Sequence, residues 1–240
     1  MYAQRSPLPE SAVLRRPPGR VSLLLEERRV LGRELLLPDL WQECEIAAHL
    51  ELAALFCRVD QVLAAAQALQ GSAVAVGTVL GLVDPDASLS GRLAEARRAV
   101  RMGARELALI LPSARLRSGD LVSLRREVSQ VCEVTSSAGA RLRVVLHTGE
   151  LTPAQVAAGC ALSQEAGAGM VAGGSWFASA LTSLPELRVM RASVDPGMQV
   201  MAVGRVRTLD HVRQLQAEGL DRFVAVNPNR VLDEEAERHG

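Results

Sequence analysis

Side chains that could transfer protons occur together at one place in the sequence. His147 directly follows the apolar run Leu142–Leu146, and Glu150 lies three residues later. Histidine titrates near neutral pH and a carboxylate can orient it, so the pair could act as a general acid and base. We favour a structural hydrogen bond instead, because no nucleophile or second base stands near them in the sequence pattern.

Lysine is absent from the sequence, and this limits its covalent chemistry. All 27 basic residues are arginines. Arginine keeps its proton at any workable pH, whereas a buried lysine can lose its proton and attack a carbonyl as a Schiff-base nucleophile. A genome that encodes arginine in place of lysine would give this composition. Such a bias would still be expected to spare a lysine on which catalysis depended.

Neither a metal site nor a redox centre is predicted. Metal-dependent chemistry needs clustered ligands, and the four histidines are scattered. The four cysteines lie far apart in apolar runs without any CxxC motif, so we interpret them as small core residues in a reducing compartment. We therefore expect no metal and no cofactor. The residues concerned are His49, His147, His211 and His239, and Cys44, Cys57, Cys132 and Cys160.

Charge and hydropathy exclude two classes of partner. The formal net charge is +0, which gives no basic field for nucleic acid. The first residues, Met1–Gly19, are interrupted by prolines and arginines and lack a signal-peptide core. The apolar runs are far shorter than the roughly 20 residues that a bilayer needs. We expect a cytoplasmic protein that binds neither nucleic acid nor a membrane.

The chain alternates between strand-like and helix-like segments. Amphipathic helices end at glycines, as at Gly103, Gly139, Gly167 and Gly219, and an apolar run follows each of them. Strands that are apolar on both faces indicate a parallel sheet covered by helices. We predict a flexible arm at 1–20, one domain at 21–232 and a charged tail at 233–240.

Eight candidate strands favour a closed barrel over an open sheet. The prediction is therefore an α/β fold, a single (β/α)8 TIM barrel with a short N-terminal extension, whose site lies where the strands end. The expected strands are Val30–Leu36, Ala53–Cys57, Ala73–Leu80, Glu106–Leu111, Leu142–His147, Met170–Gly173, Gln199–Val203 and Phe223–Val226.

Five segments in order resemble the deoxyribose-phosphate aldolase family. Val76–Leu82 looks like its A-T-V-x-G-F-P, and Leu116–Asp120 is similar to its L-K-S-G-D. Leu146–Thr152 matches E-T-G-x-L-T except that His147 replaces the glutamate. Val206–Thr208 resembles I-R-T, and Leu35–Asp39 resembles L-L-K-P-D. The order and spacing hold from about residue 31 to 232.

The resemblance implies that the catalytic residues of the family are replaced in this chain. The Schiff-base lysine of strand six falls at Ala172, and the second lysine, which lowers its pKa, falls at Met201. The proton-relay aspartate falls at Ala108 and the strand-one aspartate at Gly32. An imine needs an amine, which neither alanine nor methionine supplies.

The phosphate-binding segments of the family are also altered. Its Gly-Gly after strand seven corresponds to Gly204-Arg205, and its serine pair after strand eight to Val226-Asn227. Gly174 and Ser175 stand in the segment that replaces its T-S-T. Arg205 could hold an anion through its side chain, or it could pair with a neighbouring acid.

Two functions follow as hypotheses. In the first, the chain is catalytically inactive as an aldolase and has a binding, regulatory or assembly role. It would take a small anionic metabolite, or form a homo-oligomer or a hetero-oligomer with an active paralogue. In the second, it is an enzyme without Schiff-base chemistry that acts on a phosphorylated or carboxylated metabolite at the barrel mouth. We expect His147, Glu150, Gly174, Ser175, Gly204, Arg205 and Asn227 to line that mouth.

Overall fold

Eight parallel strands alternate with helices in the part of the chain that the computed structural model describes, residues 25–27, 37–82, 88–174, 183–225 and 228–239. The strands are β1 Leu25–Glu27, β2 Ala54–Phe56, β3 Ala75–Leu80, β4 Glu106–Ile110, β5 Arg141–Leu146, β6 Met170–Gly173, β7 Gln199–Val206 and β8 Arg222–Ala225. The helices are α1 Leu37–His49, α2 Val62–Ala68, α3 Leu89–Arg101, α4 Ser113–Arg117, α5 Leu121–Ser137, α6 Pro153–Glu165, α7 Leu184–Ala192, α8 Leu209–Ala217 and α9 Pro228–His239. Single 3-10 turns cover Val59–Gln61 and Thr148–Glu150.

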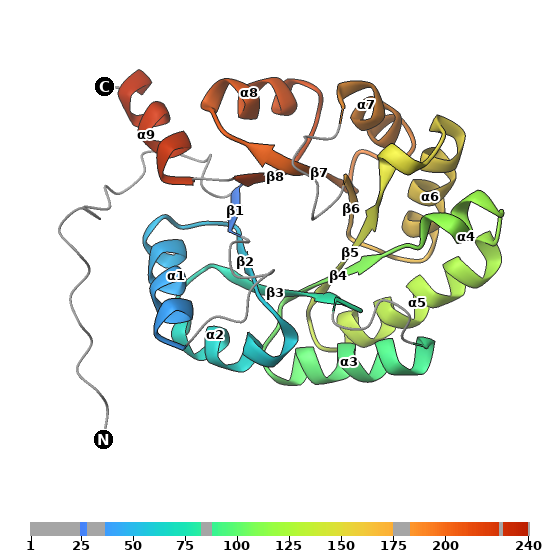
Figure 1. Cartoon of the computed structure of the whole chain (residues 1–240), viewed down its shortest axis with the longest axis horizontal. Helices are drawn as coiled ribbons and strands as arrows, with labels where there is room; N and C mark the ends of the chain where they lie inside the picture. Colours follow the sequence, from blue (N-terminus) through green and yellow to red (C-terminus); the bar gives the residue numbers. More distant parts are fainter. Residues whose placement is uncertain (1–24, 28–36, 83–87, 175–182, 226–227, 240) are drawn as a thin grey trace.

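The strands pair in sequence order and the sheet closes on itself. Each strand is parallel to the next, and β1 pairs with β8 through Leu25 opposite Phe223 and Glu26 opposite Val224. Figure 1 shows the strands at the centre and the helices around them. All strands run the same way, so their carboxyl ends meet at one end of the barrel. The predicted α/β class with a parallel sheet is confirmed.

Most of the predicted strands lie in the part of the chain that the structure describes. The strands predicted from Ala53 onward are each found within a few residues of their expected bounds. The strand expected at Val30–Leu36 falls outside the described residues. The first described strand is β1 at Leu25–Glu27, which was not predicted and pairs with both β2 and β8.

Local sequence signals set the helix ends. Thr152 and Gln155 form a capping box at the start of α6, with Pro153 in its first turn, as the sequence predicts. Gly139, after α5, has a φ of 66°, and Gly219, after α8, a φ of 78°. A residue with a side chain adopts this left-handed conformation only with strain, so glycine closes these helices.

Residues alternate between two hydrophobic clusters along each strand. On β6, Val171 faces the helices, whereas Met170 and Ala172 belong to the cluster inside the barrel. This interior cluster is formed by Ala54, Phe56, Val79, Ala108, Val145, Met170, Ala172, Met201, Val203 and Val224. Burial on both faces explains why the strands read as continuous apolar runs.

Two segments differ from their predicted environment. Residues 233–239, expected as a charged tail, are the second half of α9, and Leu232 and Glu235 are buried on one face of that helix. The spacing of Leu121, Leu124, Val128 and Val131 predicts one buried helix face, but Leu121, at the first residue of α5, is 36% exposed. The arm expected at residues 1–20 lies outside the described residues.

Candidate functional site

The two positions that the family resemblance assigns to lysines lie side by side. Ala172 of β6 and Met201 of β7 are register partners, and Val145 of β5 pairs with Ala172 on its other side. All three side chains are fully buried. A lysine at each of the two positions would place two amines next to each other, which is the arrangement that lowers an amine pKa by repulsion. Here the same place holds a methyl group and a thioether.

The surroundings of Ala172 are apolar as well. Ala108, the position that the family resemblance assigns to the relay aspartate, is fully buried in the same interior cluster, together with Val79 and Val203. None of these side chains can donate or accept a proton. The described interior around Ala172 therefore offers neither a nucleophile for a carbonyl nor an acid or base beside it.

His147 and Glu150 lie just beyond the carboxyl end of β5. His147 Nδ1 is 3.9 Å from Glu150 Oε1, which is too long for a hydrogen bond. His147 Nε2 is buried and has no hydrogen-bond partner among the described residues. Glu150 is exposed and lies 3.6 Å from Arg117 of α4. No hydrogen bond therefore joins the two side chains, and the structural hydrogen bond that we favoured for His147 has no partner at Nε2 among the described residues.

The remaining predicted site residues are only partly described. Gly174 is buried after β6, and its N–H donates to the Leu146 carbonyl at 3.0 Å. Gly204 and Arg205 belong to β7, but the description of Arg205 is limited to its backbone. Gly32, Ser175 and Asn227 lie outside the described residues.

A buried ionic cluster at the amino end of the barrel was not predicted. Glu106, the first residue of β4, receives hydrogen bonds from Arg143 of β5 at 2.9 Å and from Arg222 of β8 at 2.7 Å. Arg141 donates to Oε1 of Glu106 at 2.8 Å, Arg143 donates to Oε2, and Arg222 contacts both oxygens. The Arg143 guanidinium also lies 4.4 Å from the centre of the Phe56 ring, a cation–π contact. Charged residues at the first positions of otherwise apolar strands were the available signal.

Opposing effects set the pKa of Glu106. Burial, the largest single effect, raises the pKa, but the charges of Arg143, Arg222 and Arg141 and the hydrogen bond from Arg222 together lower it below its ordinary value. Glu106 therefore stays ionised at neutral pH. In barrels of this kind the amino end serves stability, whereas sites form at the carboxyl end.

The cysteines are core residues, as the sequence predicts. All four are free and buried. Burial raises the pKa of Cys44, Cys57 and Cys160 to about 12 each and that of Cys132 to about 11. Thiolates are the nucleophilic form, so these thiols are inert at neutral pH.

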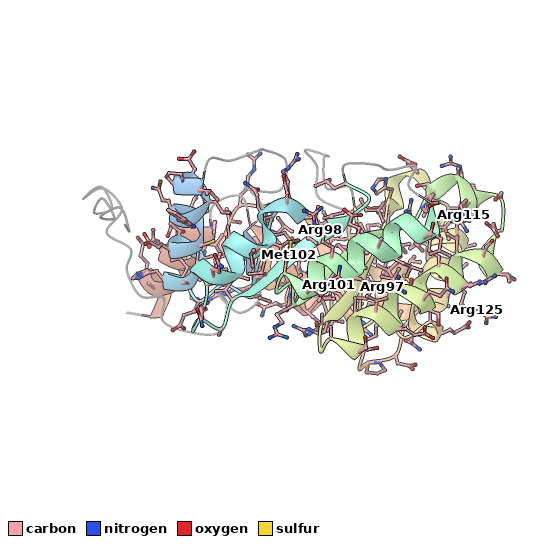
Figure 2. All side chains as sticks on the ribbon, turned by 90° about the horizontal axis from the view of Figure 1, so that it is seen from below. Arg97, Arg98, Arg101, Met102, Arg115 and Arg125 are labelled. Carbon is pink, nitrogen blue, oxygen red and sulfur yellow. The ribbon has the colours of Figure 1, made fainter. Side chains whose placement is uncertain are left out.

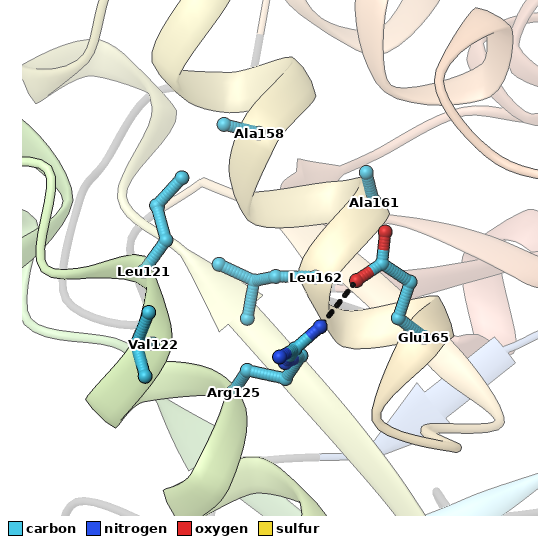
Figure 3. A pocket seen from close by; sticks show the side chains of 7 residues that line it. All are labelled: Leu121, Val122, Arg125, Ala158, Ala161, Leu162 and Glu165. Atoms are coloured by element: carbon cyan, nitrogen blue, oxygen red, sulfur yellow. Dashed lines mark hydrogen bonds and ion pairs between the residues drawn. The ribbon is translucent and has the colours of Figure 1, made fainter.

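An apolar groove lies on the outer helical layer between α5 and α6. Its volume is about 290 Å³. Figure 3 shows the Arg125–Glu165 pair, 3.3 Å apart, beside it. The groove is lined by Leu121, Val122, Arg125, Ala158, Ala161, Leu162 and Glu165. These residues belong to the helices and not to the barrel interior.

The described residues contain neither a membrane-spanning helix nor a cluster of metal ligands. No helix there is long and apolar enough to cross a membrane. No group of three or more histidine, cysteine, aspartate or glutamate side chains in that part of the chain is arranged to hold a metal ion.

Several curated proteins similar to this chain are deoxyribose-phosphate aldolases. No protein-family model matches the chain. A deoxyribose-phosphate aldolase from Brevibacillus brevis is 30% identical over 184 residues, which cover 75% of this chain and 82% of the relative. The chain belongs to the deoxyribose-phosphate aldolase family. A second family member, from Thermococcus gammatolerans, is 29% identical over 160 residues, covering 67% of this chain and 71% of its own.

Solved structures of deoxyribose-phosphate aldolases share the fold. A candidate deoxyribose-phosphate aldolase from Coccidioides immitis is 26% identical, with a TM-score of 0.82 over 92% of this chain and 88% of that chain. The deoxyribose phosphate aldolase from Aeropyrum pernix, described as tetrameric, is 19% identical, with a TM-score of 0.80 over 91% and 92% of the two chains. The described residues of this chain therefore share the fold of these solved structures.

Proposed function

We propose that this member of the deoxyribose-phosphate aldolase family does not catalyse Schiff-base aldol chemistry and acts instead by binding, as a regulatory or assembly protein. One observation carries the proposal: Ala172 and Met201, at the two lysine positions, are paired and fully buried in an apolar interior. Imine formation needs an amine, and no side chain of the sequence supplies one.

The loss extends over the whole catalytic group. Ala172 stands at the position of the nucleophile, Met201 at the position that tunes the pKa of the nucleophile, and Ala108 at the position of the relay. All three residues belong to the same apolar cluster. Groups that act as a unit lose most of their rate when one member is removed. Replacement of all three is therefore expected to abolish the family's reaction.

The test is direct. The purified protein is incubated with deoxyribose 5-phosphate and acetaldehyde is measured, with a lysine-containing deoxyribose-phosphate aldolase as positive control and heat-killed protein as blank. We expect no acetaldehyde above the blank. In parallel, borohydride is added and the intact mass is measured. A substrate adduct on a side chain of this protein would refute the proposal.

The second candidate is an enzyme of another mechanism, and His147 favours it. Its buried Nε2 has no partner among the described residues, which is an unusual state for a buried polar atom. With Glu150 and Arg205, it could act on a phosphorylated or carboxylated metabolite at the barrel mouth. Thermal-shift screening of small anions tests this alternative. A specific ligand whose stabilisation is lost in Arg205→Ala would favour it over the first candidate.

Three further features belong to this proposal. The short strand β1 completes a regular (β/α)8 TIM barrel, and helix α9 belongs to it up to His239. The protein forms a homo-oligomer, or a hetero-oligomer with an active paralogue, and the tetrameric aldolase from Aeropyrum pernix supports an assembly of barrels. It resides in the cytoplasm, where its four cysteines stay reduced. Light scattering and co-purification of a second barrel subunit test the assembly.

A further inference from the structure

The arginines of this chain gather on one part of its surface. Residues 88–126 contain nine arginines and three acidic residues, whereas the whole chain has 27 of each charge. Figure 2 looks onto this face, with Arg97, Arg98 and Arg101 along α3 and with Arg115 and Arg125 beyond it. No described carboxylate lies within ion-pair distance of Arg97, Arg98 or Arg101. Positive charge is therefore in excess here, although the chain is neutral as a whole.

A crevice opens on this face where α3 and α5 begin. Its volume is about 350 Å³, which lies at the lower end of the range for small-molecule pockets. Three arginines and one glutamate carry its charges. It is lined by Ser88, Leu89, Arg92, Arg115, Ser123, Arg126 and Glu127. We call it the arginine crevice.

The single acid of the arginine crevice is already engaged. Glu127 is buried, and its two oxygens accept hydrogen bonds from Arg92 at 2.6 Å and from Arg115 at 2.7 Å. A ligand in the crevice would therefore not meet an unpaired carboxylate. Instead, Glu127 fixes two guanidinium groups in place, so less side-chain entropy remains to be lost when an anion binds.

Donors remain for a ligand. Arg115 uses Nε for Asp120 at 2.9 Å and Nη1 for Glu127, which leaves Nη2 without a described partner. Arg126 is exposed, and no described acid pairs with it. Guanidinium groups match the oxygens of a phosphate in pairs of hydrogen bonds. The first turns of α3 and α5, helices of 13 and 17 residues, add the positive ends of their dipoles.

We infer that the arginine crevice binds a small molecule through a phosphate or diphosphate group. Three arginines face two carboxylates, Glu127 and the adjoining Asp120, so one positive charge remains in excess. This excess favours an anion, and a bounded volume favours a small molecule over an extended polyanion. The lining residues come from α3, α4, α5 and the residue before α3, and none of them belongs to the interior cluster around Ala172. The site is thus separate from the barrel interior, and its occupation does not depend on aldolase activity.

Calorimetric titration of the whole protein with pyrophosphate and with inorganic phosphate tests the inference. We expect saturable binding of pyrophosphate to the unmodified protein. Arg126→Glu should lower the affinity at least about tenfold, because it places a carboxylate on the rim and removes a guanidinium. Arg126 is exposed and forms no ion pair with a described residue, so we expect the variant to fold. Circular dichroism checks the fold of the variant.

Arg101→Glu is the matched control. It makes the same change of charge on the same face, but Arg101 does not line the crevice. It should change the affinity by less than about twofold in 0.15 M salt, since screening weakens distant charges. Equal weakening by both variants, or no saturable binding of pyrophosphate, would overturn the inference. So would a short DNA duplex that binds more tightly than pyrophosphate, because a polyanion would then be the ligand of this face.

Discussion

Glu106 shows how strongly one residue can depend on its partners. Three arginines share its carboxylate at the amino end of the barrel, and Glu106, Arg143 and Arg222 are all nearly inaccessible to water. Removing one member of such a cluster leaves the others buried without compensation. Its importance is for stability and not for chemistry, because the carboxyl ends of the strands lie at the opposite end of the barrel.

Glu106→Gln is expected to lower the free energy of unfolding by about 3–5 kcal/mol, because the buried arginines lose their counter-charge. Urea unfolding followed by circular dichroism measures the change. Glu165→Gln is the control, since Glu165 forms an exposed pair with Arg125 and should cost less than about 1 kcal/mol. Equal effects of the two changes would show that the cluster contributes no more than a surface pair.

The same carboxylate predicts a dependence of stability on pH. Its pKa is lower in the folded protein than in the unfolded chain, so the unfolded state binds a proton more readily as pH falls. Its contribution is complete above about pH 5 and is lost as pH falls through the unfolded value near 4.3 towards the lower folded value. Urea midpoints measured between pH 7 and pH 3 should fall less steeply in Glu106→Gln than in the unmodified protein.

The cysteines provide a third test at this scale. Because burial raises the pKa of every thiol to about 11 or 12, almost no thiolate is present at pH 8. With Ellman's reagent, we expect the folded protein to react negligibly within minutes and the urea-unfolded protein to release four equivalents, one for each free cysteine. Rapid reaction of one thiol before unfolding would contradict the burial described here.

At the scale of the elements, glycines end the helices before several strands. Gly103, Gly139, Gly167 and Gly219 all have positive φ angles, and each was predicted from its place between an amphipathic helix and an apolar run. Local sequence therefore decides where a helix stops. The orientation of the next strand follows, because the chain turns back towards the sheet at that residue.

Gly139→Ala isolates this effect from packing. No atom lies within 4 Å of the Cβ that the substitution would add, so the cost of the left-handed backbone should appear alone, at about 1–2 kcal/mol. Gly149→Ala is the matched control, because its Cβ would also be free of contacts and its φ is not in the left-handed region. It should change stability by less than about 0.5 kcal/mol. Thermal unfolding of both variants gives the comparison.

For the whole molecule, the barrel interior is the decisive feature. Side chains from strands far apart in the sequence fill it, and Val79, Ala108, Val145, Ala172 and Met201 are at most 1% exposed. A filled interior resists a polar replacement at any of these positions. Restoring a single lysine is therefore expected to damage the fold before it restores any chemistry.

Ala172→Lys tests this directly. A charged amine beside Met201 and Val145 should cost at least about 3 kcal/mol at pH 7, since it overpacks the interior and buries a charge. Burial lowers the amine's pKa in the folded state, so part of the loss should be recovered as pH rises. Leu63→Lys, at a position that is 50% exposed, should be nearly neutral. Unchanged stability of Ala172→Lys would mean that the interior is open to water.

The sequence alone determined several features. Apolar runs separated by glycine-ended helices predicted the α/β class, the parallel sheet and most strand positions, because these depend on residues close together in the chain. The absence of lysine and the five family segments also lead to the hypothesis that Ala172, Met201 and Ala108 stand at the family's catalytic positions, which stays a prediction. Residue types at matched positions were sufficient for that.

Other features depended on contacts between distant segments. Strand register decides three of these features: the pairing of β1 at Leu25 with β8, the contacts of Glu106 with arginines from two other strands, and the pairing of Ala172 with Met201. The periodicity of a single segment does not reveal how that segment is aligned with its neighbours. The arginine crevice brings residues from α3, α4 and α5 together in the same way. Local sequence fixes what each element is, whereas burial and charge are settled only when elements far apart in the chain pack against each other.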